Sequence, residues 1–274
     1  MSMESVGVAY YLTLVAAGLS SGFAGGLFGI GGGLLRVPIL LYVFHSFGVS
    51  ENLTFHLAAG TSLAVAIPTS MASAYRQYKA QNLDFAFLKT WIPWLVLGVV
   101  AGILISYVSS SSILKEIFVG LLAIMAIYFL FPSRPHIANE IPKGFLRGLM
   151  AAVIGGLSTL LGLSGGVLTT PSLVACNATM HRAVAVSSAG SLAVSIVAAA
   201  GMVWTGYGVA GAPSWTLGYV DLPALALMTP TVIVTAPLGV RLANFMRPRA
   251  LELAFVALLI ALGIDMAVRL ALFH

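Results

Sequence analysis

Two glycine clusters, each followed by a proline, are the features of this sequence whose residue types and spacing suggest chemistry. The first occupies residues 29–38 (GIGGGLLRVP) and the second residues 162–171 (GLSGGVLTTP). The first backbone N–H groups of a helix lack intrahelical acceptors and carry partial positive charge, and glycine lets a ligand approach the backbone closely. If a helix begins after each cluster, the sequence predicts two main-chain sites for an oxyanion. The residues expected to contact the anion are Gly31, Gly32 and Gly33 in the first cluster and Ser164, Gly165 and Gly166 in the second. Small residues also permit close packing of membrane helices, and this alternative stays open.

Arg36 places a positive charge inside an apolar stretch directly after the first cluster. A buried guanidinium can hold a carboxylate, sulfite or sulfonate in a two-pronged grip. At the aligned position of the second cluster stands Thr169, so only one cluster would supply a charge. The alternative is that the arginine extends to the membrane interface.

Hydroxyl side chains follow each cluster at similar distances along the chain. They are candidate donors to an anion, although serine and threonine in helices often bond to their own backbone carbonyls instead. The candidates are Thr61 and Ser62 after the first cluster and Ser187 and Ser188, with Ser191, after the second.

Other polar residues have structural interpretations. Asp84 and Asp221 are expected to begin helical segments and to stabilise their first turns. His56 is expected to lie at an interface, with a proton relay as the alternative. The aromatic residues expected to anchor the chain at the membrane interface are Trp91, Trp94, Tyr107, Trp204 and Tyr207.

Enzyme motifs are missing from the sequence. No Gly-Lys-Ser/Thr follows the glycines, as a nucleotide-binding loop requires, and the five histidines show no HExxH spacing. The spacing of a nucleophile elbow occurs around Ser164, but without its strand-to-helix context. A single cysteine, Cys176, excludes an intramolecular disulfide and a multi-cysteine metal site. We therefore expect no enzyme, no catalytic residues, no metal and no cofactor.

Composition sets the fold class. Charged residues make up 8% of the 274 residues, hydrophobic residues 59%, and the mean hydropathy is +1.03, whereas soluble domains are about 25% charged. Apolar stretches of roughly 20 residues recur, long enough to cross a ~30 Å hydrocarbon core. The sequence predicts an all-α polytopic membrane protein. The basic residues stand singly, without the basic stripe that nucleic acid requires.

The chain contains an internal repeat. Besides the glycine clusters, residues 59–65 align with residues 188–194, and Asp84 aligns with Asp221. We predict two membrane repeats, residues 1–132 and 143–274, joined by a linker at 133–142. Each contains five apolar pieces, of which the second (33–48 and 165–177) is short enough to be a re-entrant half-helix.

The distribution of basic residues predicts that the two repeats are inverted. An odd number of crossings per repeat places ten basic residues at one face and two, Lys115 and Arg269, at the other. The positive-inside bias then puts the linker in the cytoplasm and both termini outside. The ten are Arg76, Lys79, Lys89, Arg134, Lys143, Arg147, Arg182, Arg241, Arg247 and Arg249.

The duplicated glycine–proline blocks, with Ala59-Gly60-Thr61-Ser62-Leu63 downstream, resemble the TauE/SafE family over essentially the whole chain. That resemblance implies a multi-pass permease of the bacterial cytoplasmic membrane for sulfite or organosulfonates such as sulfoacetate. The second repeat departs from the first, with Ser187-Ser188-Ala189-Gly190 opposite Ala58-Ala59-Gly60-Thr61.

The expected function is secondary transport of small sulfur-containing oxyanions, most readily outward. Broken helices from inverted repeats typically hold an anion near the midplane in such proteins. The expected partners are this small anion and the lipid bilayer, with no nucleic acid. One alternative is transport of carboxylates or other organic anions, and another is a membrane scaffold that does not transport. The sequence leaves open the substrate, the coupling ion and the oligomeric state, a homo-oligomer included.

Overall fold

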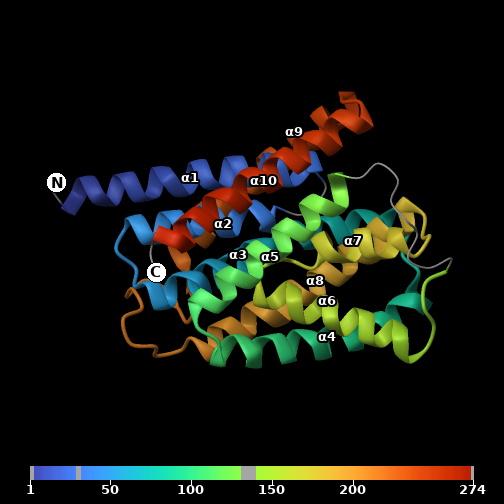
Figure 1. Cartoon of the computed structure of the whole chain (residues 1–274), viewed down its shortest axis with the longest axis horizontal. Helices are drawn as coiled ribbons and strands as arrows, with labels where there is room; N and C mark the ends of the chain where they lie inside the picture. Colours follow the sequence, from blue (N-terminus) through green and yellow to red (C-terminus); the bar gives the residue numbers. More distant parts are fainter. Residues whose placement is uncertain (1–2, 29–31, 131–139, 273–274) are drawn as a thin grey trace.

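The protein is a bundle of helices (Figure 1), and its described residues include one short β-hairpin. The computed structural model describes residues 3–28, 32–130 and 140–272. The first half contains α1 (Met3–Phe28), α2 (Gly33–Ser46), α3 (Glu51–Lys79), α4 (Phe85–Val108) and α5 (Ser111–Leu130). The second contains α6 (Phe145–Leu160), α7 (Gly166–Ala175), α8 (Met180–Thr205), β1 (Thr216–Leu217), β2 (Val220–Asp221), α9 (Leu222–Phe245) and α10 (Pro248–Leu272). A helix stands at each of the apolar pieces that the sequence predicts; the β1–β2 hairpin was not predicted.

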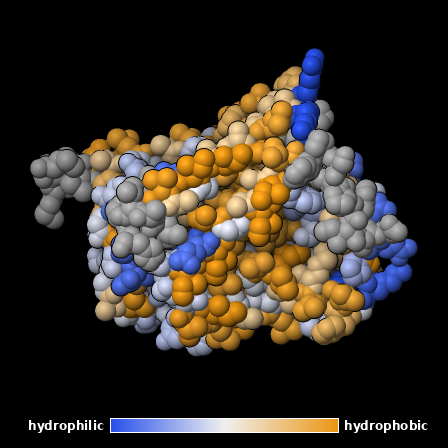
Figure 2. All heavy atoms as spheres, in the orientation of Figure 1, coloured by the Kyte–Doolittle hydropathy of each residue, from blue (hydrophilic) through white to orange (hydrophobic). Residues whose placement is uncertain are grey.

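Seven of these helices, within the described residues, are long and apolar enough to cross a membrane. They are α1, α3, α4, α5, α8, α9 and α10. Figure 2 shows a broad apolar surface across the middle of the visible face and hydrophilic residues along the right-hand edge. Because lipid cannot satisfy backbone hydrogen bonds, helices are the expected spanning elements. The protein is an all-α polytopic membrane protein, as the composition predicts.

The bundle has two distinct ends. At the terminal end, where α1 begins, Tyr10 packs on Phe47 at 4.9 Å and Lys115 pairs with Glu51 at 2.8 Å. At the linker end, where α6 begins, Arg182 pairs with Asp84 at 2.9 Å. The ends of α1 and α10 that carry the two termini lie toward the same side in Figure 1.

Glycines bring helices from different halves into close contact. Along α1 and α9, Gly18 lies against Thr231 and Gly26 against Ala236, so these two helices run parallel. Along α4 and α6, Gly98 lies against Ala152 and Gly102 against Gly156, so these also run parallel. Small residues allow such close approach of membrane helices.

The central pair, α3 and α8, is antiparallel. Gly60 lies beside Met202, and Ser73 Oγ lies 3.0 Å from Ser188 Oγ, so the numbering rises along one helix as it falls along the other. These two helices have the most buried apolar windows of the seven, at 67% and 61%. They form the centre around which the other helices pack.

The α4–α6 contact generates a stability prediction. A Cβ on Gly98 would overlap Ala152 O, so Gly98→Ala must push the two backbones apart. Overpacking typically costs about 1–3 kcal/mol. We expect Gly98→Ala to lower the melting temperature of the detergent-solubilised protein, measured by tryptophan fluorescence. Gly120→Ala, on α5, is the matched control, because a Cβ there meets nothing within 4 Å. Equal melting temperatures for the two variants would contradict the contact.

Candidate functional site

The two glycine clusters meet inside the bundle. Helix α2 begins at Gly33 and ends at the terminal end, whereas α7 begins at Gly166 and ends at the linker end. Their 14 and 10 residues rise about 21 and 15 Å at 1.5 Å per residue, so neither spans the membrane. A Cβ on Gly33 would lie 3.4 Å from Leu163 Cα, next to the second cluster. The starts of α2 and α7 are therefore neighbours, and the two helices run from there toward opposite ends of the bundle.

The same backbone geometry precedes each short helix. Gly32 (φ 75°) and Gly165 (φ 87°) are the N-cap residues of α2 and α7, both in the left-handed region that favours glycine. Neither helix start receives a side-chain cap. The first N–H groups of each helix lack intrahelical acceptors, and the two partial positive charges face the same region. Gly31, the remaining predicted glycine, lies outside the described residues.

Arg36 is fully buried on the first turns of α2. One guanidinium nitrogen, Nη1, donates to Ser62 O at 2.9 Å, and Ser62 Oγ in turn donates to Gly162 O at 2.8 Å. These bonds connect α2, α3 and the loop before α7. The charge therefore lies at the meeting point of the two helix starts, not at an interface.

Buried hydroxyls surround the start of α7. A Cβ on Gly166 would lie 3.0 Å from Ser191 Oγ and 3.2 Å from Ser187 Oγ, both on α8. Thr169 Oγ1 and Ser158 Oγ are buried without a hydrogen-bond partner among the described residues. A buried hydroxyl without a partner is unusual and costly. This end of the site therefore has spare donors for an anion.

Two further predicted hydroxyls form hydrogen bonds within the protein. Thr61 Oγ1 accepts a hydrogen bond from Asp221 N at 2.9 Å. Ser188 Oγ donates to Val184 O at 2.8 Å and lies beside Ser73. Ser164 is 2% exposed in the loop before α7. The structure thus brings the glycines, Arg36, Ser62, Thr169 and Ser187 to one region, and uses Thr61 and Ser188 for helix contacts.

The β1–β2 hairpin closes the site toward the terminal end. Its Tyr219 O lies against Gly60, one residue before Thr61 and two before Ser62. The Tyr219 ring packs on the His56 ring at 5.1 Å. His56 is buried, with Nε2 2.9 Å from Ser106 O and Nδ1 3.2 Å from Ser111 Oγ. The hairpin and these contacts therefore shield His56 from the surroundings of the protein.

Asp84 and Asp221 both begin helices, as predicted, but in contrasting surroundings. Asp84 Oδ1 accepts from Phe87 N at 3.0 Å, and Asp221 Oδ1 accepts from Ala224 N at 2.7 Å. The Phe87 N–H, assisted by Arg182, lowers the pKa of the partly exposed Asp84 carboxyl. Asp221 is fully buried, and its Oδ2 accepts from Tyr10 Oη at 2.7 Å and Trp215 Nε1 at 3.1 Å. Burial raises the pKa of Asp221, against the effect of these hydrogen bonds.

The prediction that Trp91 anchors the chain at the membrane interface is wrong. Trp91 is fully buried and stacks on Phe87 at 5.4 Å, whereas Trp94, Tyr107, Trp204 and Tyr207 are exposed. Trp91 lies on the face of α4 that packs on α8, where Gly190 is its neighbour. Sequence reasoning also missed Ser158, Tyr10 and Trp215; no spacing signal links them to the glycine clusters.

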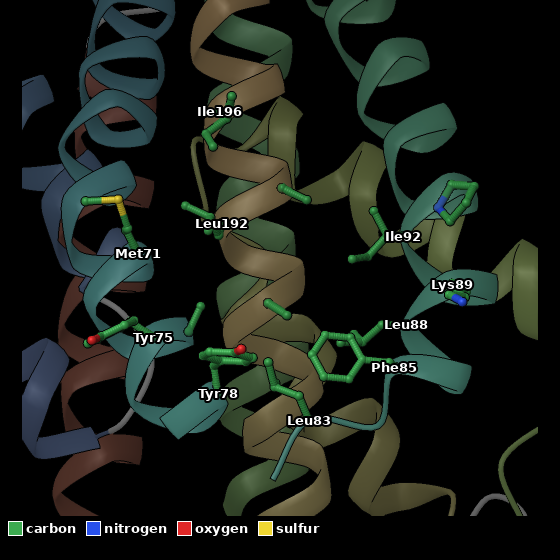
Figure 3. Close-up of a pocket in the computed structure, with 14 residues that line it drawn as sticks. Met71, Tyr75, Tyr78, Leu83, Phe85, Leu88, Lys89, Ile92, Leu192 and Ile196 are labelled. Carbon is green, nitrogen blue, oxygen red and sulfur yellow. The ribbon is translucent and has the colours of Figure 1, made fainter. Parts of the chain in front are cut away.

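The groove in Figure 3 is a poor anion site. It has a volume of 740 Å³ and lies between α3, α4 and α8, with Met71, Tyr75 and Tyr78 on one side and Phe85, Leu88 and Ile92 on the other. Lys89 is its single charged lining residue. Such a surface suits hydrocarbon chains, so the anion chemistry belongs to the helix starts.

The contrast between the two aspartates gives a second prediction. Asp221→Ala would leave Tyr10 Oη and Trp215 Nε1 without their shared acceptor and would remove the α9 cap. Loss of buried, charged hydrogen bonds costs about 1.5–3 kcal/mol each. Asp84→Ala, the matched control, loses a cap and an exposed ion pair only. We expect Asp221→Ala to lower the melting temperature clearly more than Asp84→Ala. An equal or smaller effect would mean that the hairpin is not held by Asp221.

Comparison with known proteins supports the interpretation of this chain as a membrane transporter. Residues 14–266 match the family described as sulfite exporter TauE/SafE. A probable membrane transporter protein of Methanocaldococcus jannaschii is 30% identical over 262 residues, covering 92% of this chain and 94% of the relative. A second, from Haemophilus influenzae, is 28% identical over 263 residues, covering 94% and 98%. No solved structure matches the chain.

Proposed function

The chain belongs to the sulfite exporter TauE/SafE family of membrane transporters, and we propose that it is a secondary transporter that exports small sulfur-containing oxyanions. Sulfite and organosulfonates such as sulfoacetate are the proposed substrates. The observation that carries this proposal is the meeting of two short helices at their N-terminal ends inside the bundle.

The helix starts provide the electrostatics that an oxyanion needs. Each presents free N–H groups behind a left-handed glycine, a recurrent way to bind anions. Arg36 adds a full charge at one start, and Thr169 and Ser158 add hydroxyl donors at the other. A sulfonate or sulfite has several oxygens in a compact group, which suits donors that converge from two sides.

Antiparallel packing of equivalent helices supports inverted repeats. Helices α3 and α8 occupy the same place in the two halves and run in opposite directions. The two parallel pairs obey the same relation. Helices α1 and α6 are equivalent in the two halves, as are α4 and α9, and α1 packs on α9 just as α6 packs on α4. A two-fold axis in the membrane plane relates such halves, and alternating access proceeds by rocking one repeat against the other.

The basic residues support a cytoplasmic linker end. Arg76 and Lys79 end α3, and Lys143, Arg147 and Arg182 lie around the starts of α6 and α8. By the positive-inside bias, this end faces the cytoplasm and both termini lie outside the inner membrane. An interior-negative potential then drives a monovalent anion outward by about 2.3 kcal/mol per 100 mV.

Flux measurements test the proposal. Proteoliposomes loaded with sulfite or sulfoacetate should release the anion faster than protein-free liposomes, and faster still with an inside-negative potassium diffusion potential. Acetate and succinate, loaded in parallel, address the alternative of carboxylate transport. Protein-dependent flux of carboxylates alone would overturn the substrate class, and no flux of any anion would favour a scaffold.

Arg36 is the residue whose charge the proposal needs. Loss of a charge-assisted bond of about 1.5–3 kcal/mol predicts that Arg36→Ala weakens sulfite binding at least about tenfold, measured by ligand-dependent thermal stabilisation. Arg36→Lys, which keeps the charge, is expected to retain part of the affinity if the alanine variant fails to fold. Lys115→Ala is the control: it removes a basic side chain at the terminal end, where Lys115 pairs with Glu51 outside the site. Unchanged affinity in both arginine variants would exclude Arg36 from the site.

A further inference from the structure

A second electropositive pocket lies at the linker end, away from the two helix starts. It has a volume of 270 Å³ and lies between the starts of α4, α6 and α8 and the end of α7. Arg147, Arg182 and Lys143 line it, with Glu140. Its volume holds several water molecules at about 30 Å³ each, and so holds a small oxyanion.

Two guanidinium groups are held against one aromatic ring in this pocket. The Arg147 and Arg182 guanidinium carbons lie 4.9 and 5.2 Å from the centroid of the Phe87 ring. Phe87 is 4% exposed, and Trp91 stacks on it from the interior. The buried ring therefore anchors both cations at one side of the pocket, although like charges repel. An anion between them would relieve that repulsion.

Among the described residues, the carboxylates in and beside the pocket leave one of these charges uncompensated. Asp84 pairs with Arg182 at 2.9 Å, and Glu140 pairs with Lys143 at 3.1 Å. Arg147 instead donates to two neutral oxygens, Pro142 O from Nε at 3.0 Å and Thr90 Oγ1 from Nη1 at 3.1 Å. These bonds orient the guanidinium without neutralising it. The starts of α4, α6 and α8 add further partial positive charge.

We propose that this pocket binds an oxyanion group, a sulfonate, sulfate or phosphate, between Arg147 and Arg182. A free anion from solution and the phosphate of an anionic lipid present the same chemistry, and the experiment below separates them. The choice of a sulfonate among the oxyanions rests on the proposed function; the binding of an oxyanion does not. Helix α7 leads from this pocket to the buried start at Gly166, about 15 Å away along its 10 residues.

Cys176 offers a local readout, because it lines the pocket and is the single cysteine of the chain. Burial raises the pKa of its thiol, so labelling is carried out at pH 8.5. We compare a sulfonate-bearing and a trimethylammonium-bearing methanethiosulfonate, each normalised to its rate with free 2-mercaptoethanol. In the wild type we expect the anionic reagent to react about tenfold faster, and millimolar sulfate or phosphate to slow it saturably at constant ionic strength.

Arg147→Gln should bring the ratio of the two rates close to one and abolish protection by sulfate and phosphate. Arg76→Gln is the matched control, because it removes one charge from the same end, on the last turn of α3, outside the pocket. Equal effects of the two variants, or no preference for the anionic reagent in the wild type, would overturn the proposal. If Cys176 reacts with neither reagent, the rise in melting temperature caused by sulfate is measured instead. Loss of this rise in Arg147→Gln but not in Arg76→Gln would support the proposal.

Lipid composition separates the two sources of the oxyanion. Wild-type protein in nanodiscs of phosphatidylcholine is compared with protein in nanodiscs that also contain phosphatidylglycerol. If lipid occupies the pocket, phosphatidylglycerol protects Cys176 and Arg147→Gln removes that protection; if free anions occupy it, sulfate protects equally in both. Flux is not measured here, so loss of the pocket and failure of sulfite transport are distinguishable results.

Discussion

Backbone polar groups that end a helix inside a membrane must find partners within the protein, and this constraint organises the whole structure. Lipid offers none, so irregular backbone at that depth is tolerated only where protein or a polar cavity surrounds it. Here the start of α2 lies against the break before α7, and both are enclosed by α3 and α8. Left-handed glycines turn the chain at both breaks. The same unsatisfied N–H groups that make a break costly make it suitable for an anion.

The two halves share an architecture but differ in chemistry. Arg36 stands at the start of α2, whereas the equivalent Thr169 on α7 has a buried hydroxyl without a partner among the described residues. Asp84 is partly exposed beside Arg182, whereas Asp221 is buried and holds the hairpin through Tyr10 and Trp215. In the proposed site, one anion would therefore meet a charge from one side and hydroxyls from the other.

The two ends of the bundle differ in the same way. The terminal end is covered by the β1–β2 hairpin, which reaches Gly60 and Thr61 near the middle of the chain's central helix pair. The linker end has an open cationic pocket around Phe87, below which Trp91 and Leu173 are fully buried.

The fold class could be predicted from the amino-acid sequence alone, as could the position of each helix, the two glycine clusters before α2 and α7, and the capping roles of Asp84 and Asp221. Composition, glycine–proline punctuation and helix-start chemistry are local properties, so they can be recognised without coordinates. The packing of the helices was needed to show which hydroxyls lack partners among the described residues, that Trp91 and His56 are buried, and that Arg147 and Arg182 share one ring. These facts depend on which faces of distant helices pack together. Helical periodicity does not reveal the packed face when nearly every face of a membrane helix is apolar.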